Sequence, residues 1–482
     1  MTSRFDHFIK FFVCKYFFIA AAIFCIVSFL VPVSTYPWPS FYHEYSIYLS
    51  LFFLLAGSCL MFRHWSLNSI TLYIFAFSLV PILQAVFGLV YFWGDALLVF
   101  FYMFAAFLSV LCGQAFTKNN SRDVAMHYFA LSFFVLGFVN VLFALNQYFS
   151  LTFFDGFLAK NFQGKAFGNL RQPNNFSSAL VISFFCAWYF FEKQFFSKKI
   201  YWLLILFFSI GLVLSQSRTT VLVGVVVFIF YCLKCRSIRF RVTWFEWGWV
   251  LLSYLLCFLL LPEIKGLVSF GTETDTALRE FQADGNGRRA IWFQSLALIL
   301  NGPLWGHGFN QIGSHLLLSD HSDSIIYFRH SHNLFLDILL YCGPIVGSFV
   351  VVSILWFAWQ VILRSKTIEG WCAAAIVCSV FIHSLLEYPL HYAFFLLPVA
   401  FLVGLFDWAP PTSERGYRSF LLAPLLVLFS VLLVVVWNDY KIIKKEEWKY
   451  RIELTGVMKR DVQNESVNDM LVLTQRREHL NF

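Results

Sequence analysis

Residues Ala96–Phe116, with the sequence ALLVFFYMFAAFLSVLCGQAF, form a stretch of 21 positions without a charged residue. A helix needs about 20 mostly apolar residues to cross the roughly 30 Å of hydrocarbon in a bilayer. The stretch therefore predicts a transmembrane helix. Comparable apolar runs occur at twelve other places: Phe11–Val31, Ser46–Phe62, Leu67–Val90, His127–Phe149, Phe176–Phe191, Ile200–Ser217, Thr219–Leu233, Trp244–Leu261, Asn333–Leu363, Trp371–Leu386, Tyr392–Phe406 and Phe420–Trp437.

Two short interruptions decide how many helices these runs form. Arg218 separates one pair of runs, and Glu387-Tyr388-Pro389 separates another. Each interruption could be a break inside one tilted helix or a turn between two helices. We therefore expect 12 or 13 transmembrane helices, with 13 favoured.

The composition of the whole chain agrees with a membrane protein. Only 13% of its residues are charged and 59% are apolar, whereas a soluble domain carries roughly 25% charged residues. This excludes a soluble enzyme, a disordered chain and a nucleic-acid-binding protein, despite a net charge of +8. The apolar runs do not alternate with polar residues, which excludes a transmembrane barrel. The predicted fold class is an all-α polytopic membrane protein.

Apolar and polar segments divide the chain into four regions. These are N-terminal transmembrane helices with a polar loop at 150–175, a large loop containing short helices, C-terminal transmembrane helices and a polar tail, at 1–261, 262–332, 333–437 and 438–482. Within the large loop we expect a helix from Arg288 to Leu300, followed by a turn around Gly302-Pro303, Gly306 and Gly308.

Basic residues fall on alternate connections between the predicted helices, which indicates the side that faces the cytoplasm. They include Lys193, Lys198, Lys199, Lys234, Arg236, Arg239, Arg241, Arg364 and Lys366. The loops 150–175 and 262–332 then lie on the outer side of the membrane. With thirteen spans the tail would lie outside as well.

We expect neither a metal nor a cofactor. None of the eleven cysteines lies in the large loop or the tail, and Cys232-x-x-Cys235 lacks the two further ligands of a zinc site. The chain contains no Gly-x-x-x-x-Gly-Lys-Ser/Thr and no Gly-x-Gly-x-x-Gly motif for nucleotide phosphates. Any reaction must therefore use energy stored in its substrate or in a gradient.

Arginines on the outer side are the most informative anomaly, because the positive-inside bias should deplete them there. They are Arg171, Arg218, Arg288, Arg289 and Arg329. An arginine near hydrocarbon must be paired or face water, and its planar fork of donors suits a phosphate or diphosphate. Pairing with lipid headgroups or loop acids is the alternative for each residue. As a set they favour an outward anion site, beside a loop with five histidines: His307, His315, His321, His330 and His332.

Five segments in a fixed order resemble the Wzy-C superfamily of O-antigen ligases, O-antigen polymerases and bacterial protein O-oligosaccharyltransferases. They are Ser215–Arg218 (SQSR), Gly287–Trp292 (GRRAIW), Asn301–Gly308 (NGPLWGHG), His330–Asp337 (HSHNLFLD) with Gly343 and Gly347, and Glu387–Leu390 (EYPL). A sixth, Gly168–Asn175 (GNLRQPNN), resembles the Gln-Pro-Asn signature of PglL-type oligosaccharyltransferases, which glycosylate type IV pilins.

Two observations qualify the resemblance. Gln172-Pro173-Asn174 could also be no more than a helix start, with an Asn cap and Pro in the first turn. Val346 stands where O-antigen ligases have Gly, Thr or Tyr, and the glycine follows one position later. This departure at Val346 counts mildly against a lipopolysaccharide ligase.

The resemblance implies a bacterial inner-membrane enzyme whose active site faces the periplasm. Such an enzyme moves a glycan from an undecaprenyl-diphosphate carrier in the bilayer to a Ser or Thr hydroxyl of a periplasmic protein such as a pilin, by one inverting displacement. His332 matches the essential histidine and would be the general base, with His330 as a rival and a helix-cap role as the alternative. Arg218 and Arg288 match the diphosphate-binding arginines, and Arg289 could share that role.

Six further residues are candidates for supporting the site or binding the acceptor: Gln172, Asn174, Asn333, Asp337, Glu387 and Tyr388. Asn333 and Asp337 lie four residues apart, on one helix face, and could orient the imidazole or form a buried hydrogen-bonded pair. Glu387 lies where a span breaks, a common position for a functional carboxylate.

Other functions stay open at this point. An O-antigen ligase or polymerase would use the same donor with a sugar acceptor. A transporter for lipid-linked sugars is a different class, although such proteins usually contain internal repeats, and the sequence shows no convincing one.

Overall fold

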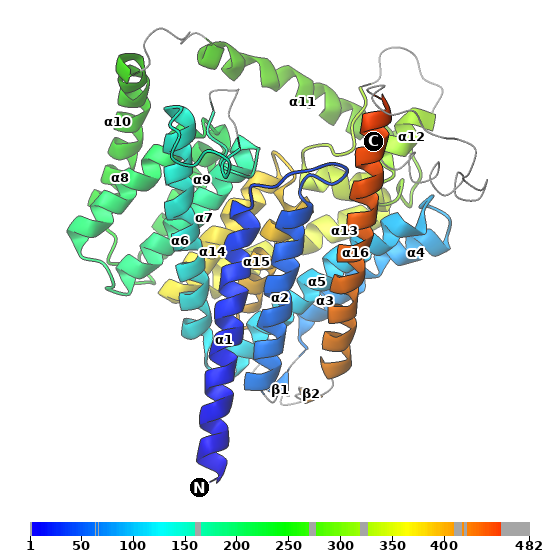
Figure 1. Cartoon of the computed structure of the whole chain (residues 1–482), viewed down its shortest axis with the longest axis horizontal. Helices are drawn as coiled ribbons and strands as arrows, with labels where there is room; N and C mark the ends of the chain where they lie inside the picture. The colour runs from blue at the N-terminus through cyan, green and yellow to red at the C-terminus, as the bar shows by residue number, and fades with distance from the viewer. Residues whose placement is uncertain are drawn as a thin grey trace.

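The computed structural model describes residues 2–62, 64–65, 67–159, 165–268, 276–318, 326–408, 417–418 and 422–454. The predicted all-α membrane fold is confirmed (Figure 1). The helices are α1 Thr2–Leu30, α2 Phe41–Met61, α3 Ser69–Ser78, α4 Val80–Val86, α5 Trp93–Lys118, α6 Arg122–Tyr148, α7 Pro173–Glu192, α8 Lys198–Leu214, α9 Arg218–Lys234, α10 Trp244–Val268, α11 Thr276–Asn301, α12 Ile312–Leu318, α13 Leu334–Arg364, α14 Ile368–Ser384, α15 Ala393–Gly404 and α16 Ala423–Leu454.

Within the described residues, each of the thirteen apolar runs lies mostly on helix. In the described part of the chain, seven helical segments are long and apolar enough to cross a membrane, and shorter apolar helices accompany them. The run Leu67–Val90 is divided into α3 and α4 at Leu79, two residues before Pro81 in the first turn of α4, because proline lacks the N–H that would continue the hydrogen bonds of α3. The protein is therefore a multi-pass membrane protein.

Both interruptions noted in the sequence separate distinct helices. Between α8 and α9, Gln216 adopts a positive φ of 51° and the chain turns before Arg218. Between α14 and α15, residues Leu385–Tyr388 lead into a 3₁₀ turn at Pro389–His391. In contrast, α13 runs through a kink at Gly343, whose φ is 75°.

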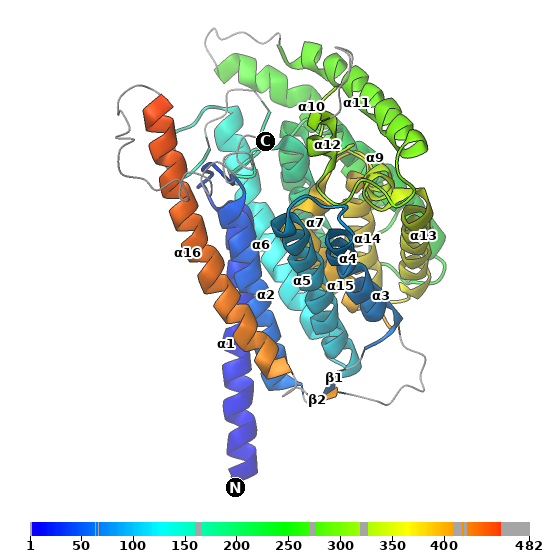
Figure 2. The same ribbon diagram turned by 90° about the vertical axis from the view of Figure 1, so that its right-hand side faces the viewer.

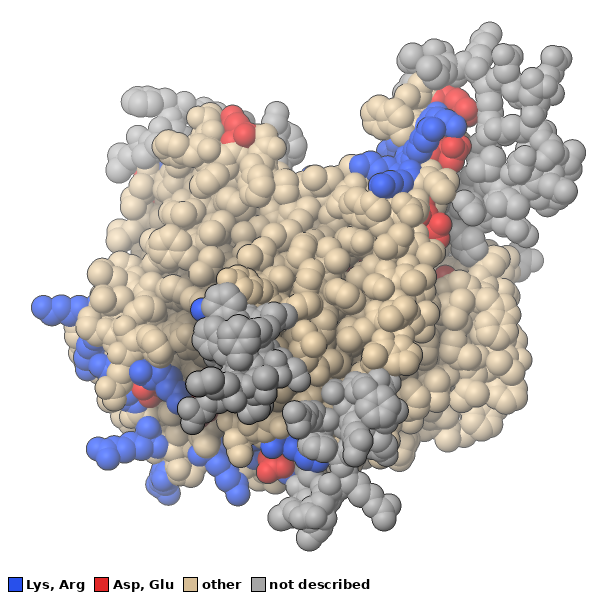
Figure 3. All heavy atoms as spheres, turned by 60° about the horizontal axis from the view of Figure 1, so that its bottom comes forward, with Lys and Arg blue, Asp and Glu red and all other residues tan. Residues whose placement is uncertain are grey.

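The two ends of the bundle differ in charge. Figure 3 shows many Lys and Arg side chains gathered along the end at which α1 begins and a second group, mixed with Asp and Glu, at the upper right of the view, whereas α11 and α12 lie at the end opposite the start of α1 (Figures 1 and 2). The last helix, α16, ends on the side of α11. Tyr440 on α16 packs on Phe41, with ring centroids 3.5 Å apart, and its hydroxyl is 2.9 Å from Thr35 Oγ1. Residue 440 thus lies beside the α1–α2 connection, as an odd number of spans predicts.

Close helix packing holds the centre of the bundle together. A methyl group on Gly113 of α5 would overlap the carbonyl of Phe401 on α15, and small residues of this kind allow membrane helices to approach closely. The helix α7 is buried along almost its whole length. Its first turn, where Gln172-Pro173-Asn174 lies, is therefore fixed against the bundle.

Several boundaries differ from those expected. The predicted loop helix Arg288–Leu300 belongs to the longer helix α11, which lies across the end of the bundle opposite the start of α1 (Figure 1) and packs against α13. The helix α10 continues through Pro262 to Val268, and α16 continues past Trp437 to Leu454. His321 and the tail from 455 onward lie outside the described residues.

Candidate active site

Glu387 is the centre of a cluster drawn from four parts of the chain. Its carboxylate is 4% exposed and has three polar partners: Arg288 of α11, His332 before α13 and Asn174 of α7. The oxygen Oε2 is 2.7 Å from His332 Nδ1. The other oxygen, Oε1, forms an ion pair with Arg288 and accepts a hydrogen bond from Asn174 Nδ2 at 3.2 Å. The charge of a nearly buried carboxylate is thus balanced at the outer end of the bundle.

His332 is held in an uncommon backbone conformation. Its φ is 58°, in a region that non-glycine residues rarely occupy and that costs of order 1–3 kcal/mol. Asn333 caps α13 by accepting from the N–H groups of Phe335 and Leu336, and its Nδ2 donates to the Leu385 carbonyl at 3.0 Å. The α13 cap is thereby tied to the segment that carries Glu387.

Ser331, just before the histidine, is fixed from two further sides. Its N–H donates to Asp337 Oδ1 at 2.7 Å, and its carbonyl accepts from Trp292 Nε1 at 2.9 Å. Asp337 therefore supports the backbone beside His332. The GRRAIW segment contributes both an arginine to Glu387 and a tryptophan to this loop.

Asn174 links the carboxylate to the start of α9. Ser217 Oγ donates to Asn174 Oδ1 at 2.8 Å, while Asn174 donates to Glu387. Ser217 immediately precedes Arg218, whose side chain is exposed in the first turn of α9. The QPN and SQSR segments therefore meet at the same carboxylate.

The charges around Glu387 keep it ionised. Burial pushes the pKa of Glu387 upward, but the hydrogen bond from His332 and the charge of Arg288 outweigh burial and hold it below its ordinary value. An ionised Glu387 accepts the Nδ1–H of His332. The other ring nitrogen, Nε2, is then an acceptor, and this is the tautomer that a general base needs.

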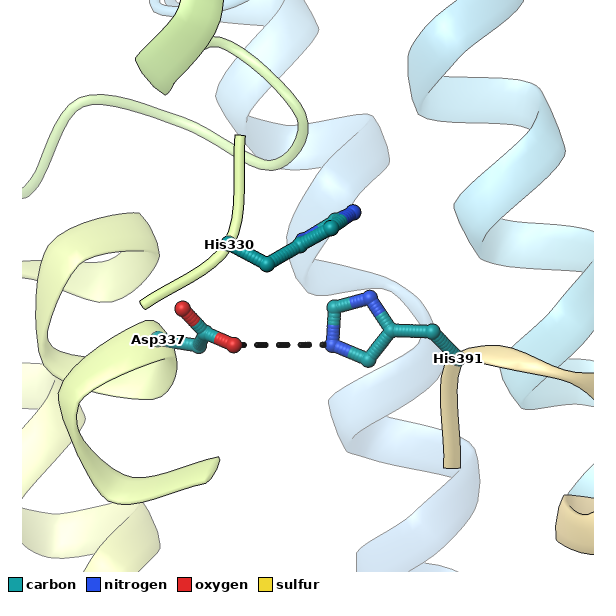
Figure 4. Close-up of side chains that lie close together, drawn as sticks. All are labelled: His330, Asp337 and His391. Atoms are coloured by element: carbon teal, nitrogen blue, oxygen red, sulfur yellow. Dashed lines mark ion pairs between the residues drawn. The ribbon is translucent and has the colours of Figure 1, made fainter. Parts of the chain in front are cut away.

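A second cluster consists of His330, Asp337 and His391 (Figure 4). His391 Nε2 is 3.8 Å from Asp337 Oδ2, the His330 and His391 rings are 4.3 Å apart, and His330 Nδ1 is 2.9 Å from the Tyr341 hydroxyl. The pKa of His330 is well below its ordinary value, chiefly because the residue is buried. The charges of His391, His332 and Arg329 lower it further. His330 is thus a neutral residue whose Nδ1 is directed to Tyr341.

The second cluster is the one group of potential metal ligands in the described residues. One potential ligand atom from each of His330, Asp337 and His391 lies within 4.8 Å of the others. Ligand atoms about 2.0–2.2 Å from a tetrahedral ion would be roughly 3.4 Å apart. The cluster is wider than that, and we assign it no metal.

The remaining candidates lie around these two clusters. The Tyr388 ring is 5.0 Å from that of His332 and 5.1 Å from that of His330. Arg289 is exposed on α11 next to Arg288, and Gln172 is the half-buried residue that precedes α7. The structure therefore brings Asn174, Arg288, His332, Glu387 and Tyr388 together, with Arg218 and Arg289 each adjacent in sequence to a residue of the cluster.

Sequence reasoning missed three polar residues near the cluster. Ser217 joins Asn174 to the start of α9, His391 contacts Asp337, and the buried His383 is 2.7 Å from Ser178 Oγ. A signal existed for two of them: His383 and His391 stand four residues before and four residues after Glu387.

Comparisons with known proteins find similarity to two families and to two O-oligosaccharyltransferases. The chain matches the family described as O-Antigen ligase over residues 203–351 and the family described as Virulence factor membrane-bound polymerase, C-terminal, over residues 371–475. It is 28% identical over 474 residues to a General O-oligosaccharyltransferase of Acinetobacter baylyi, covering 95% of this chain and 81% of that protein. It is 27% identical over 396 residues to a ComP-specific O-oligosaccharyltransferase of the same organism, covering 81% and 71%.

The fold and these similarities define the class of protein: a polytopic membrane protein that is similar to O-antigen ligases over residues 203–351 and to O-oligosaccharyltransferases over most of its length. Both relatives are named as O-oligosaccharyltransferases, which is a glycosyltransferase activity, and the PglL-type resemblance agrees with them. The resemblance drawn from the short sequence segments is thereby confirmed.

Proposed function

We propose that the protein transfers a glycan from an undecaprenyl-diphosphate carrier to a Ser or Thr hydroxyl of a periplasmic acceptor protein such as a type IV pilin. The observation that carries this proposal is the Arg288–Glu387–His332 arrangement, which joins a cation for a diphosphate to an oriented base. Activated donors of this kind need no nucleotide, which agrees with the absence of nucleotide-phosphate motifs from the sequence.

His332 is the general base in this proposal. Nε2 takes the proton of the acceptor hydroxyl while the hydroxyl oxygen bonds to the anomeric carbon of the donor sugar. The bond between that carbon and the diphosphate oxygen breaks, and undecaprenyl diphosphate leaves with the electron pair. Glu387 stabilises the imidazolium that forms at His332. A single displacement of this kind inverts the anomeric configuration.

Arginine side chains stabilise the leaving group. Charge builds up on the diphosphate as the glycosyl bond breaks, and fixed cations lower the energy of that state. Arg218 and Arg289 are exposed on α9 and α11, and Arg288 of α11 already pairs with Glu387. A guanidinium can contact two phosphate oxygens at once, so these residues suit the donor diphosphate.

The proposed location is the bacterial inner membrane, with the site facing the periplasm. Arg288 lies on α11, at the end of the bundle opposite the basic end (Figures 1 and 3). Basic connections face the cytoplasm. A lipid-linked donor in the outer half of the membrane would therefore present its diphosphate at the level of this cluster.

A protein acceptor is favoured over a sugar acceptor. Asn174 of the QPN segment, whose resemblance is to pilin-modifying enzymes, contacts Glu387 directly. The O-antigen ligase match over residues 203–351 supports the second candidate, an O-antigen ligase or polymerase. Both share the donor chemistry and differ in the acceptor.

A deletion strain separates these acceptors. Our proposal predicts that the pilin loses its glycan mass while the lipopolysaccharide pattern is unchanged, and that wild-type protein restores the mass. Loss of O-antigen from lipopolysaccharide with an unchanged pilin mass would favour the ligase. Accumulation of lipid-linked glycan on the cytoplasmic face would instead indicate a transporter.

A further inference from the structure

A large cavity lies next to the catalytic cluster, between the outer ends of α2 and α5 and the segments around α12 and Pro389–His391. Its volume is about 890 Å³, inside the roughly 300–1,000 Å³ range of small-ligand sites. We call it the outer cavity, and its lining includes Trp38, Tyr91, Asp95, Tyr327, Tyr388 and His391.

The outer cavity reaches the reacting groups at one end. Tyr388 lines the cavity, and its ring is 5.0 Å from the imidazole of His332. His330 and His391 of the second cluster line the cavity as well. A ligand that fills the cavity would therefore extend to the place where the acceptor proton is removed.

Aromatic rings with exposed faces are one part of the lining. Tyr91 is 56% exposed and Tyr327 is 45% exposed, yet both line the cavity. Sugar rings carry C–H groups on their faces and hydroxyl groups around their edges. Tyrosine rings can pack on the C–H faces of a sugar, and their hydroxyl groups can form hydrogen bonds with the sugar hydroxyls.

A fixed carboxylate is the other part of the lining. Asp95 Oδ2 accepts from Gln311 Nε2 at 3.0 Å, and Gln311 Oε1 accepts from the Tyr91 N–H at 3.2 Å. The Asp95 carboxylate is held in place before a ligand arrives, so its free lone pairs can accept hydrogen bonds from sugar hydroxyls.

We propose that the outer cavity binds the oligosaccharide of the lipid-linked donor, with the reducing-end sugar at Tyr388 and later sugars toward Tyr91 and Asp95. The proposal rests on the proposed transferase function. The glycan is the occupant favoured over the acceptor peptide, because a peptide needs to place only one hydroxyl at His332, whereas the tyrosine rings and the Asp95 carboxylate form an extended surface that suits a hydroxyl-rich chain.

The test measures transfer from two different donors to one acceptor peptide by the purified full-length protein. One donor is a polyprenyl diphosphate that carries a single sugar, and the other carries an oligosaccharide. Tyr91→Ala should raise the KM for the oligosaccharide donor roughly fivefold, as expected for the loss of one aromatic contact. Asp95→Asn should also raise it. The KM for the single-sugar donor and for the acceptor should change less than about twofold in both variants.

Two further variants are controls. Tyr91→Phe keeps the ring and should retain most of the affinity for the oligosaccharide donor. Phe153→Ala removes an exposed ring outside the cavity and should change the KM for neither donor. Normal transfer of the single sugar shows that a variant is folded.

The proposal is overturned if Tyr91→Ala and Asp95→Asn raise the KM of the acceptor instead, which would make the cavity a peptide site. It is equally overturned if both donors are affected alike or neither is affected. Failure of the wild-type protein to modify any acceptor would count against the transferase function itself, which is a different result.

Discussion

Replacing Glu387 by Gln should slow glycan transfer strongly while leaving the shape of the site intact. The carboxylate is nearly buried, accepts from His332 and pairs with Arg288. Hydrogen bonds to charged groups contribute about 1.5–3 kcal/mol, and the bond to His332 gains its full value only when the imidazole takes up a proton. Loss of that amount in the transition state lowers kcat by about 10- to 150-fold.

The tautomer of His332 adds to this effect. A Gln side chain can present its amide N–H to Nδ1, which would move the ring proton to Nε2 and remove the base. The KM for the donor should change little, since the mutation removes no positive charge from the diphosphate site. The assay is transfer from a lipid-linked donor to an acceptor peptide, with kcat and KM measured separately for each substrate.

Glu369→Gln is the matched control. Glu369 lies in the first turn of α14 and pairs with Lys193 at the basic end of the bundle. It is a largely buried, cation-paired carboxylate at the opposite end of α14 from Glu387. A kcat of Glu387→Gln within twofold of wild type, or an equal loss of kcat in Glu369→Gln, would refute the reasoning.

Three further predictions follow from the same cluster. Arg288→Lys keeps the charge but not the planar fork, so kcat/KM for the donor should fall about tenfold or more; an unchanged value would contradict the diphosphate role, which steady-state kinetics can decide. Ser217→Ala removes the hydrogen bond to Asn174 and should lower kcat roughly two- to tenfold, with thermal stability measured alongside to detect simple unfolding. Because the pKa of Glu387 is lowered in the folded protein, its contribution to stability should be fully present above about pH 4.5 and be lost as the pH falls through the lowered value; melting curves of wild type and Glu387→Gln should converge on acidification, and a constant difference would contradict the ion pairs.

Much of the fold was predictable from local patterns. Long uncharged runs specify membrane helices because burial in lipid depends on composition over about 20 residues. The two interruptions at Arg218 and Glu387 were also visible, although only the structure shows that both separate distinct helices. The extra length of α11 and α16 was missed, since their polar residues carry no membrane signal.

The site was predictable in its residues more than in its geometry. Short segments indicated Arg288, His332 and Glu387 individually, but nothing local relates positions 99 and 55 residues apart in the chain. The contact of Asn174 with Glu387 spans 213 residues. Such contacts arise from helix packing, which the apolar pattern does not specify uniquely.

The intact mass of a pilin acceptor is the most direct test of the account. Purified protein would be mixed with an undecaprenyl-diphosphate-linked glycan and the pilin, in parallel with the His332→Ala and His330→Ala variants. We predict that wild-type protein adds one glycan mass, that His332→Ala adds none, and that His330→Ala retains measurable transfer because His330 does not contact Glu387's carboxylate in the described site. Transfer by His332→Ala at the wild-type rate, or no added mass with the wild-type protein, would contradict the account.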